Sequence, residues 1–162
     1  MPGKGKAGIS WDSCVFLAYF NEESDKQIDI IEKIIKLVES KNLVMVVSTI
    51  CYVEVLDKAD QCDAGKKFRA FMKHESALPA NVDERVGELA AQFRQQICEA
   101  LERGEISRGL KAPDAIIAAT AVHYNVTELH TFDPDLLALS DSPLIGKLHI
   151  CKPALPGGQL VF

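Results

Sequence analysis

Residues 43–59, LVMVVSTICYVEVLDKA, decide the fold class of this chain. The first part, residues 43–48, is a continuous apolar run rich in β-branched side chains, which is typical of a strand buried on both faces. The second part, residues 49–59, is predicted to form a helix that carries Glu54. A doubly buried strand followed directly by a helix indicates a parallel sheet with helices on both faces.

The rest of the chain repeats this alternation of strand and helix. Further strands are predicted at residues 8–12, 76–80, 127–131 and 148–153. Helices are predicted at residues 14–20, 64–74 and 113–124, with a short one after residue 132. The segment at 103–112 is predicted to be a polar loop. The alternation therefore extends over most of the sequence.

Two more helices are predicted from their capping residues. One begins at Ser24, with Gln27 completing a capping box. The other is a long helix capped by Asn81 and Glu84, with an apolar stripe that begins at Val82.

The length and charge of the chain bound its class. With 162 residues it is the size of one domain. We expect residues 8–153 to form that domain, between a flexible Gly/Lys-rich segment at 1–7 and an irregular tail at 154–162. The net charge of -5 argues against a general nucleic-acid coat protein, which would be basic overall. An enzyme that handles nucleic acid through metal ions and a local basic patch remains compatible with that charge.

The sequence favours a reduced, cytoplasmic protein without a membrane segment. The N-terminal MPGKGKAG has no apolar signal core, and no apolar run approaches the roughly 20 residues of a membrane span. The five cysteines are odd in number and include no CxxC pair. The four histidines show no HxxxH or HxH spacing, which argues against zinc ligation.

Four acids fall where a parallel sheet builds its sites. Asp12 ends the first strand, Glu54 lies in the helix after the second, and Asp133 follows a later strand. Asp114 begins the helix that leads to that later strand. Singly, each acid has a structural interpretation as a turn residue, a solvated acid or a helix-start acid. Together they are harder to explain by stability, because like charges at one edge repel one another and lose solvent. We therefore expect a hard cation such as Mg²⁺ or Mn²⁺ among them.

Four motifs give the chain a resemblance to PIN-domain ribonucleases of the kind found in VapC-type toxins. They are WDSCVFLA at 11–18, STICYVEVL at 48–56, LKAPDAIIAATA at 110–121 and LHTFDPDL at 129–136. The motifs occur in the family's order and the resemblance covers roughly residues 8–150. It implies a three-layer α/β/α sandwich with a central, mostly parallel sheet.

By the same resemblance, the four acids form the active site of a metal-dependent endoribonuclease. Asp12, Asp114 and Asp133 would bind one or two Mg²⁺ or Mn²⁺ ions. Glu54 would bind metal or orient the attacking water. Asp135 is an alternative to Asp133, because FDPD replaces the more usual turn of the family at this point.

Hydroxyl and basic residues complete the predicted site. Ser13 and Thr131 match the small hydroxyl residues that often flank the acids in the family. Ser48 and Thr49 offer two hydroxyls where the family commonly has one, so either could face the site. Positive charge near the acids is needed to bind RNA, although a solvated face is the alternative interpretation of any basic cluster. The candidate RNA-binding residues are Arg103, Arg108 and Lys111.

The resemblance also implies a biological role. It predicts the toxin of a type II toxin–antitoxin system, with RNA as substrate, a cognate antitoxin protein as partner and a homodimeric assembly. The alternative is a PIN-like scaffold that binds RNA or protein without nuclease activity. The presence of all four acids favours the enzyme, because a degenerate site would be expected to have lost some of them.

Overall fold

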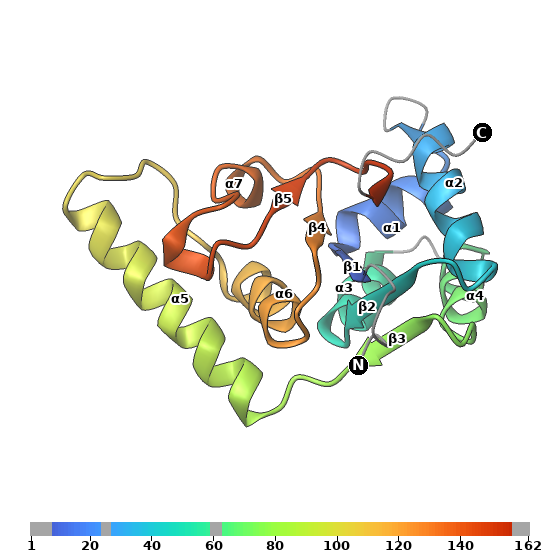
Figure 1. The fold of residues 1–162 in the computed structure, drawn as a ribbon, viewed down its shortest axis with the longest axis horizontal. Helices are drawn as coiled ribbons and strands as arrows, with labels where there is room; N and C mark the ends of the chain where they lie inside the picture. The colour runs from blue at the N-terminus through green and yellow to red at the C-terminus, as the bar shows by residue number, and fades with distance from the viewer. Residues whose placement is uncertain (1–7, 24–26, 59–62, 157–162) are drawn as a thin grey trace.

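A parallel sheet forms the centre of the fold. The computed structural model describes residues 8–23, 27–58 and 63–156. Its five-stranded sheet has the order β3-β2-β1-β4-β5, and every neighbouring pair of strands is parallel (Figure 1). The strands are β1 (Gly8–Trp11), β2 (Val44–Ser48), β3 (Ala77–Ala80), β4 (Glu128–His130) and β5 (Ile150–Cys151).

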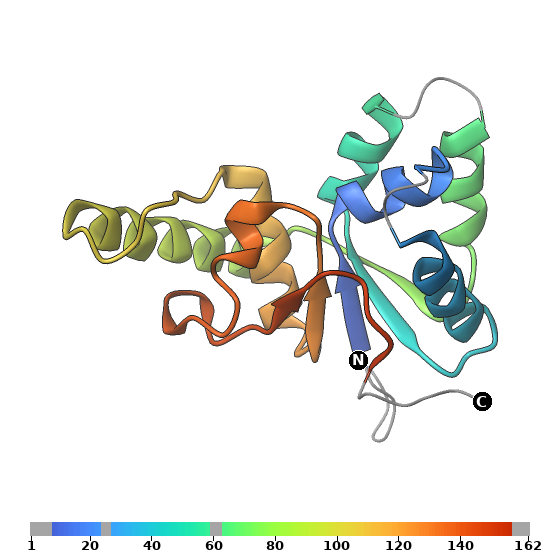
Figure 2. The same ribbon diagram turned by 90° about the horizontal axis from the view of Figure 1, so that it is seen from above.

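Helices cover both faces of this sheet and give the fold three layers. They are α1 (Ser13–Phe20), α2 (Ile28–Glu39), α3 (Ile50–Lys58), α4 (Asp63–Phe71), α5 (Glu84–Glu102), α6 (Ala112–His123) and the short α7 (Pro134–Leu137). Figure 2 shows α5 and α6 on one side of the sheet and α1, α2 and α4 on the other. The predicted α/β/α sandwich with a parallel sheet is confirmed.

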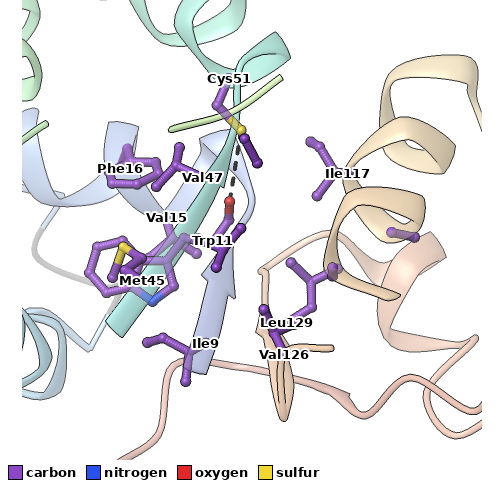
Figure 3. Packing of buried hydrophobic residues seen from close by; sticks show 14 of the residues in the cluster. Ile9, Trp11, Val15, Phe16, Met45, Val47, Cys51, Ile117, Val126 and Leu129 are labelled. Atoms are coloured by element: carbon purple, nitrogen blue, oxygen red, sulfur yellow. Dashed lines mark hydrogen bonds between the residues drawn. The ribbon is translucent and has the colours of Figure 1, made fainter. Parts of the chain in front are cut away.

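The core is built around β1, the middle strand of the sheet (Figure 3). Ile9 and Trp11 are fully buried, and the Trp11 ring meets the Phe16 ring of α1 edge-on at 5.1 Å between centroids. The Trp11 indole Nε1 donates a hydrogen bond of 3.0 Å to Nδ1 of His130 on β4. The polar end of this large side chain is thus satisfied inside the core, as burial requires.

Helix α6 is buried because it lies between the sheet and α5. Its sequence APDAIIAATAVH is apolar almost all round, which is the pattern of an enclosed helix. The small side chains of Ala115, Ala118, Ala119 and Ala121 are buried and allow its neighbours to approach closely. The only acid in this helix is Asp114, in its first turn.

Both predicted helix caps differ from the observed ones. Helix α5 begins at Glu84, and its cap is Asp83, whose Oδ1 accepts a hydrogen bond from the Val86 amide at 3.0 Å. The predicted cap at Asn81 is therefore wrong, and Val82 lies outside the helix with an exposed side chain.

Helix α2 begins at Ile28, with Gln27 at the cap position in a left-handed backbone conformation and without a side-chain cap. Gln27 therefore does not serve as the third residue of a helix that starts at Ser24, which itself lies outside the described residues.

The C-terminal part of the sheet is shorter than predicted. Strand β5 covers two residues rather than the predicted 148–153, and a 3-10 helix at Pro143–Ile145 was not predicted. The predicted flexible segment at 1–7 and most of the predicted tail lie outside the described residues. Within the part of the chain that is described, no helix is long and apolar enough to cross a membrane.

Candidate active site

The four predicted acids lie at the point where the order of the strands in the sheet reverses. In the order β3-β2-β1-β4-β5, the chain moves one way from β1 to β3 and returns to the other side of β1 with β4. Such a switch point opens a crevice outside the carboxyl ends of the two central strands. Asp12 directly follows β1, and its amide donates to the carbonyl oxygen of His130 at the end of β4 at 3.0 Å. Residues that follow β1 and β4 therefore meet.

The Asp12 carboxylate is directed into this crevice by three donors. Asp12 occupies the N-cap position of α1, yet its side chain makes no capping hydrogen bond, although an aspartate at this position commonly does. Instead, Thr131 Oγ1 donates to Oδ2 at 2.8 Å, Ser13 Oγ donates to Oδ1 at 3.3 Å and Cys14 Sγ donates to Oδ2 at 3.2 Å. The buried Asp12 side chain is thus held for a purpose other than helix capping.

Thr131 connects Asp12 to Asp133. Its Oγ1 accepts a hydrogen bond of 2.9 Å from the Asp133 amide while it donates to Asp12. Oδ1 of Asp133 accepts from the Asp135 amide at 2.7 Å and so caps α7. The Asp135 carboxylate is paired with Arg108 at 2.7 Å. The geometry therefore favours Asp133 over Asp135 as the fourth acid of the cluster.

Asp114 shows the electrostatic consequence of bringing these acids together. Asp114 is only 9% exposed, and the pKa of its carboxyl is raised from an ordinary 3.8 to about 6, first of all by burial. The negative charges of Asp12, Asp133 and Glu54 contribute to the same rise in that order, while Lys111 opposes it. A position in the first turn of α6 should stabilise the anion. Because the pKa is raised nonetheless, the helix-start interpretation does not account for this residue.

Glu54 provides an independent sign that a cation belongs here. It lies in the second turn of α3, and its Oε2 atom is buried without a hydrogen-bond partner among the described residues. An unpaired buried carboxylate oxygen is costly unless a positive charge compensates it. Asp12, Glu54 and Asp133 lie close enough to Asp114 to raise its pKa, and carboxylate oxygens are the ligands that Mg²⁺ and Mn²⁺ prefer. The donor set therefore fits a hard divalent cation.

The basic residues predicted to bind RNA lie in different settings. Arg108 reaches the candidate site through Asp135, and Lys111 lies close enough to Asp114 to lower its pKa. Arg103 is paired with Glu105 on the exposed loop after α5. The structure thus brings two of the three predicted basic residues to the rim of the acidic crevice.

The two hydroxyls that the sequence left open make other contacts. Ser48 Oγ accepts from Thr120 Oγ1 of α6 at 3.1 Å, and Thr49 Oγ1 accepts from the Val82 amide at 3.4 Å. Neither is hydrogen-bonded to an acid of the site among the described residues.

Cys14 is a site residue that the sequence analysis did not identify. Besides its bond to Asp12, its Sγ lies 3.4 Å from Thr131 Oγ1 and accepts from the Phe132 amide at 3.3 Å. Burial, followed by the charge of Asp12, raises the pKa of its thiol to about 12. The thiol therefore stays protonated and acts as a donor. Its place two residues after Asp12, at the start of a helix, was the available signal.

Comparison with known proteins agrees with this geometry. The family model of the PIN domain matches residues 9–141, which is most of the chain and includes all four acids. The chain belongs to the PIN domain family. No curated protein matches it.

Solved structures with a similar fold include a toxin–antitoxin complex and a described toxin. A toxin–antitoxin complex from Klebsiella pneumoniae has a TM-score of 0.59 and 20% identity, with 90% of this chain and 98% of that chain covered. FitAcB from Neisseria gonorrhoeae has a TM-score of 0.56 and 18% identity, covering 90% and 97%. VapC20 from Mycobacterium tuberculosis, described as a sarcin-ricin loop cleaving toxin, has a TM-score of 0.55 and 21% identity, covering 80% and 93%. At these identities the likeness establishes the fold.

Proposed function

We propose that this protein is a metal-dependent endoribonuclease that hydrolyses phosphodiester bonds of RNA. The observation that carries the proposal is the proximity of Asp12, Glu54 and Asp133 to Asp114, whose pKa burial and then these three charges raise to about 6. A stable fold gains nothing from four acids in one crevice, whereas a metal-dependent hydrolase needs them. Membership of the PIN domain family supports the same conclusion.

The chain's own residues would have distinct roles in the reaction. Asp12, Asp114 and Asp133 would hold Mg²⁺ or Mn²⁺, and Thr131 would fix the orientation of Asp12 through its 2.8 Å hydrogen bond. Glu54 would bind metal or orient the attacking water through its unpaired Oε2. When bound, a divalent ion supplies water activation and neutralises charge that develops on the phosphate.

RNA would approach along the basic rim of the crevice. Arg108 and Lys111 are exposed and lie on the segment between α5 and the start of α6, next to Asp114 and Asp135. Cations in these positions offset the repulsion between the acidic cluster and a polyanionic backbone. The described activity of VapC20 as a loop-cleaving toxin supports a nuclease on this fold.

We also propose that the protein acts in the cytoplasm as the toxin of a type II toxin–antitoxin pair, as a homodimer with a cognate antitoxin. The similar structure described as a toxin–antitoxin complex supports this role. Co-expression with the product of an adjacent short reading frame should give a stable complex in which RNA cleavage is suppressed. Light scattering of the isolated protein should report twice the 17.8 kDa chain mass. A monomer mass would contradict the dimer alone.

The decisive experiment compares cleavage of a mixed-sequence single-stranded RNA by the wild-type protein and by Asp114→Asn. We expect cleavage only with Mg²⁺ or Mn²⁺. The variant should lose at least about 100-fold, because even a residue that merely supports a metal ligand can account for that factor. Asp83→Asn is the matched control, since Asp83 also starts a helix but caps α5 away from the cluster, and asparagine caps as well as aspartate.

The outcomes separate the proposal from its alternative. Equal cleavage by wild type and Asp114→Asn would place the activity elsewhere or in a contaminant. No cleavage of any RNA by either protein, with metal binding intact, would favour a PIN-like scaffold without nuclease activity. Loss in both Asp114→Asn and Asp83→Asn would indicate a folding effect rather than a catalytic one.

A further inference from the structure

A second group of metal-ligating side chains lies on strand β4, on strand β5 and at the residue just before β5. Glu128, His149 and Cys151 each offer a ligand atom, and these three atoms lie within 4.8 Å of one another. The group contains a carboxylate, an imidazole and a thiol, so it differs in chemistry from the all-carboxylate crevice. It draws on two strands that are far apart in sequence but adjacent in the sheet (Figure 1).

Sheet register explains why these side chains converge. His130 pairs with Cys151 across β4 and β5, and side chains two residues apart on a strand point to the same face. Glu128 is therefore on the same face as His130. His149 precedes Cys151 by two residues, so its side chain lies on that face as well. The arrangement follows from backbone pairing and does not depend on a chance meeting of flexible side chains.

Hydrogen bonds orient the carboxylate of this group from the protein interior. Trp11 Nε1 donates to His130 Nδ1 at 3.0 Å, so the proton of a neutral His130 ring is on Nε2. His130 Nε2 lies 3.1 Å from Glu128 Oε2 and can donate to it. This interaction fixes the position of the Glu128 carboxylate. A fully buried histidine thus fixes a carboxylate that is only 13% exposed.

The histidine of the group has an outer partner of its own. His149 Nδ1 lies 3.0 Å from Asp141 Oδ2, so a proton on Nδ1 would donate to Asp141 and leave the lone pair on Nε2 for a metal. A carboxylate behind a histidine is the usual support of a metal-bound imidazole. Glu128 and His149 therefore both have the second partner that metal ligands commonly have.

We propose that Glu128, His149 and Cys151 form a zinc site on the edge of the sheet, separate from the acidic crevice. A thiolate and an imidazole select a borderline-soft ion such as Zn²⁺ over Mg²⁺ or Mn²⁺. Tetrahedral zinc with bonds of about 2.0–2.3 Å needs ligand atoms somewhat closer than 4.8 Å. His149 is half exposed and can close that gap by a side-chain movement.

Binding at this site is a proton exchange without oxidation or reduction. In the metal-free protein Cys151 Sγ donates to Glu128 Oε2 at 3.4 Å, so the thiol carries its proton. Zinc forms one bond to sulfur, and that proton passes to the solvent. Because the Cys151 thiol is a hydrogen-bond donor in this structure, zinc binding is expected to release about one proton per ion.

The test uses Co²⁺ as a spectroscopic probe for zinc, with the purified full-length protein in excess Mg²⁺ to occupy the acidic crevice. We expect one equivalent of Co²⁺ to produce a thiolate-to-cobalt charge-transfer band, and Zn²⁺ to abolish it. Cys151→Ser and His149→Asn should each weaken Co²⁺ binding by at least about 10-fold. Because His149 is on the surface, His149→Asn should leave the fold intact, and it keeps the test valid if Cys151→Ser is unstable.

Two control variants show which cysteine is responsible. Cys14→Ser removes the thiol beside Asp12, and Cys98→Ser removes an exposed thiol of α5. Both should keep the band. Loss of the band in Cys14→Ser but not in Cys151→Ser would assign the metal to the acidic crevice and overturn the proposal. Absence of any band in the wild type, or binding unchanged in His149→Asn, would also overturn it. None of these results depends on RNA cleavage, so the two proposals fail independently.

Discussion

Replacing Asp114 by asparagine should stabilise the metal-free protein above neutral pH. The folded-state pKa of about 6 lies above the ordinary value of 3.8 that the unfolded chain should show. The folded state therefore binds the Asp114 proton more tightly, and stability falls as the pH rises from about 3.8 to about 6. Above about pH 6 the whole penalty is present, and an uncharged asparagine removes it.

The size of the effect follows from the same two pKa values. Each tenfold change in proton affinity is worth about 1.4 kcal/mol, so the full difference corresponds to roughly 3 kcal/mol. Solvent screening of a group that is only partly enclosed reduces this to about 1.5 kcal/mol. Loss of the favourable helix-dipole interaction subtracts about 0.5 kcal/mol. The net gain of about 1 kcal/mol should raise the Tm by roughly 2–4 °C for a chain of this length.

Thermal unfolding in a metal chelator at about pH 7.5 and at about pH 4 measures this prediction. The Tm of Asp114→Asn should exceed that of the wild type at the higher pH and match it at the lower pH. Asp83→Asn, which preserves a helix cap, should leave the Tm unchanged at both. An unchanged or lower Tm for Asp114→Asn at the higher pH would refute the claim that these acids repel one another. A gain of equal size at both pH values would show that it has another cause.

Three further outcomes are expected. Excess Mg²⁺ or Mn²⁺ should raise the Tm of the wild type more than that of Asp114→Asn, because bound metal offsets the repulsion between the carboxylates of the site. Equal shifts in Tm would mean that Asp114 is not a ligand. Thr131→Val should lower the free energy of unfolding by about 1–3 kcal/mol in urea titrations, because the Asp12 carboxylate loses a buried hydrogen-bond donor. An unchanged urea midpoint would contradict the 2.8 Å hydrogen bond. Arg108→Ala should alter stability by less than about 1 kcal/mol, since its pair with Asp135 is half exposed, yet lower the salt dependence of RNA binding by about one charge. A salt dependence equal to that of the wild type would exclude Arg108 from the RNA path.

The architecture could be predicted from the sequence because strands β1 and β2 are buried on both faces. A run such as residues 43–48 has no polar face, and only a layered parallel sheet accommodates several such runs. The residues at which helices begin were harder to predict from the sequence. Asn81 and Asp83 are both good caps two residues apart, and only packing of the following helix selects Asp83. The length of β5 likewise depends on pairing with β4, which local propensity does not encode.

The acidic cluster could be predicted from residue type and chain order, with help from the family resemblance. The structure adds what those cannot supply: that Asp133 rather than Asp135 acts on Asp114, and that Cys14 donates to Asp12. The absence of HxxxH or HxH spacing was a sound argument against a zinc site within one helix or strand. It does not address Glu128 and His149, because the proximity of their strands comes from the sheet and not from the interval between them in the chain.

The buried position of Trp11 makes it a natural optical reporter. It is the chain's only tryptophan, it immediately precedes Asp12, and its indole is hydrogen-bonded to the histidine that contacts Glu128. One fluorophore is therefore linked to both sites: to the acidic crevice through Asp12, which follows it in the chain, and to the proposed zinc site through the hydrogen bonds of His130. Its emission should remain blue-shifted as long as the core is intact, and changes in its intensity should register events at either site without any added label.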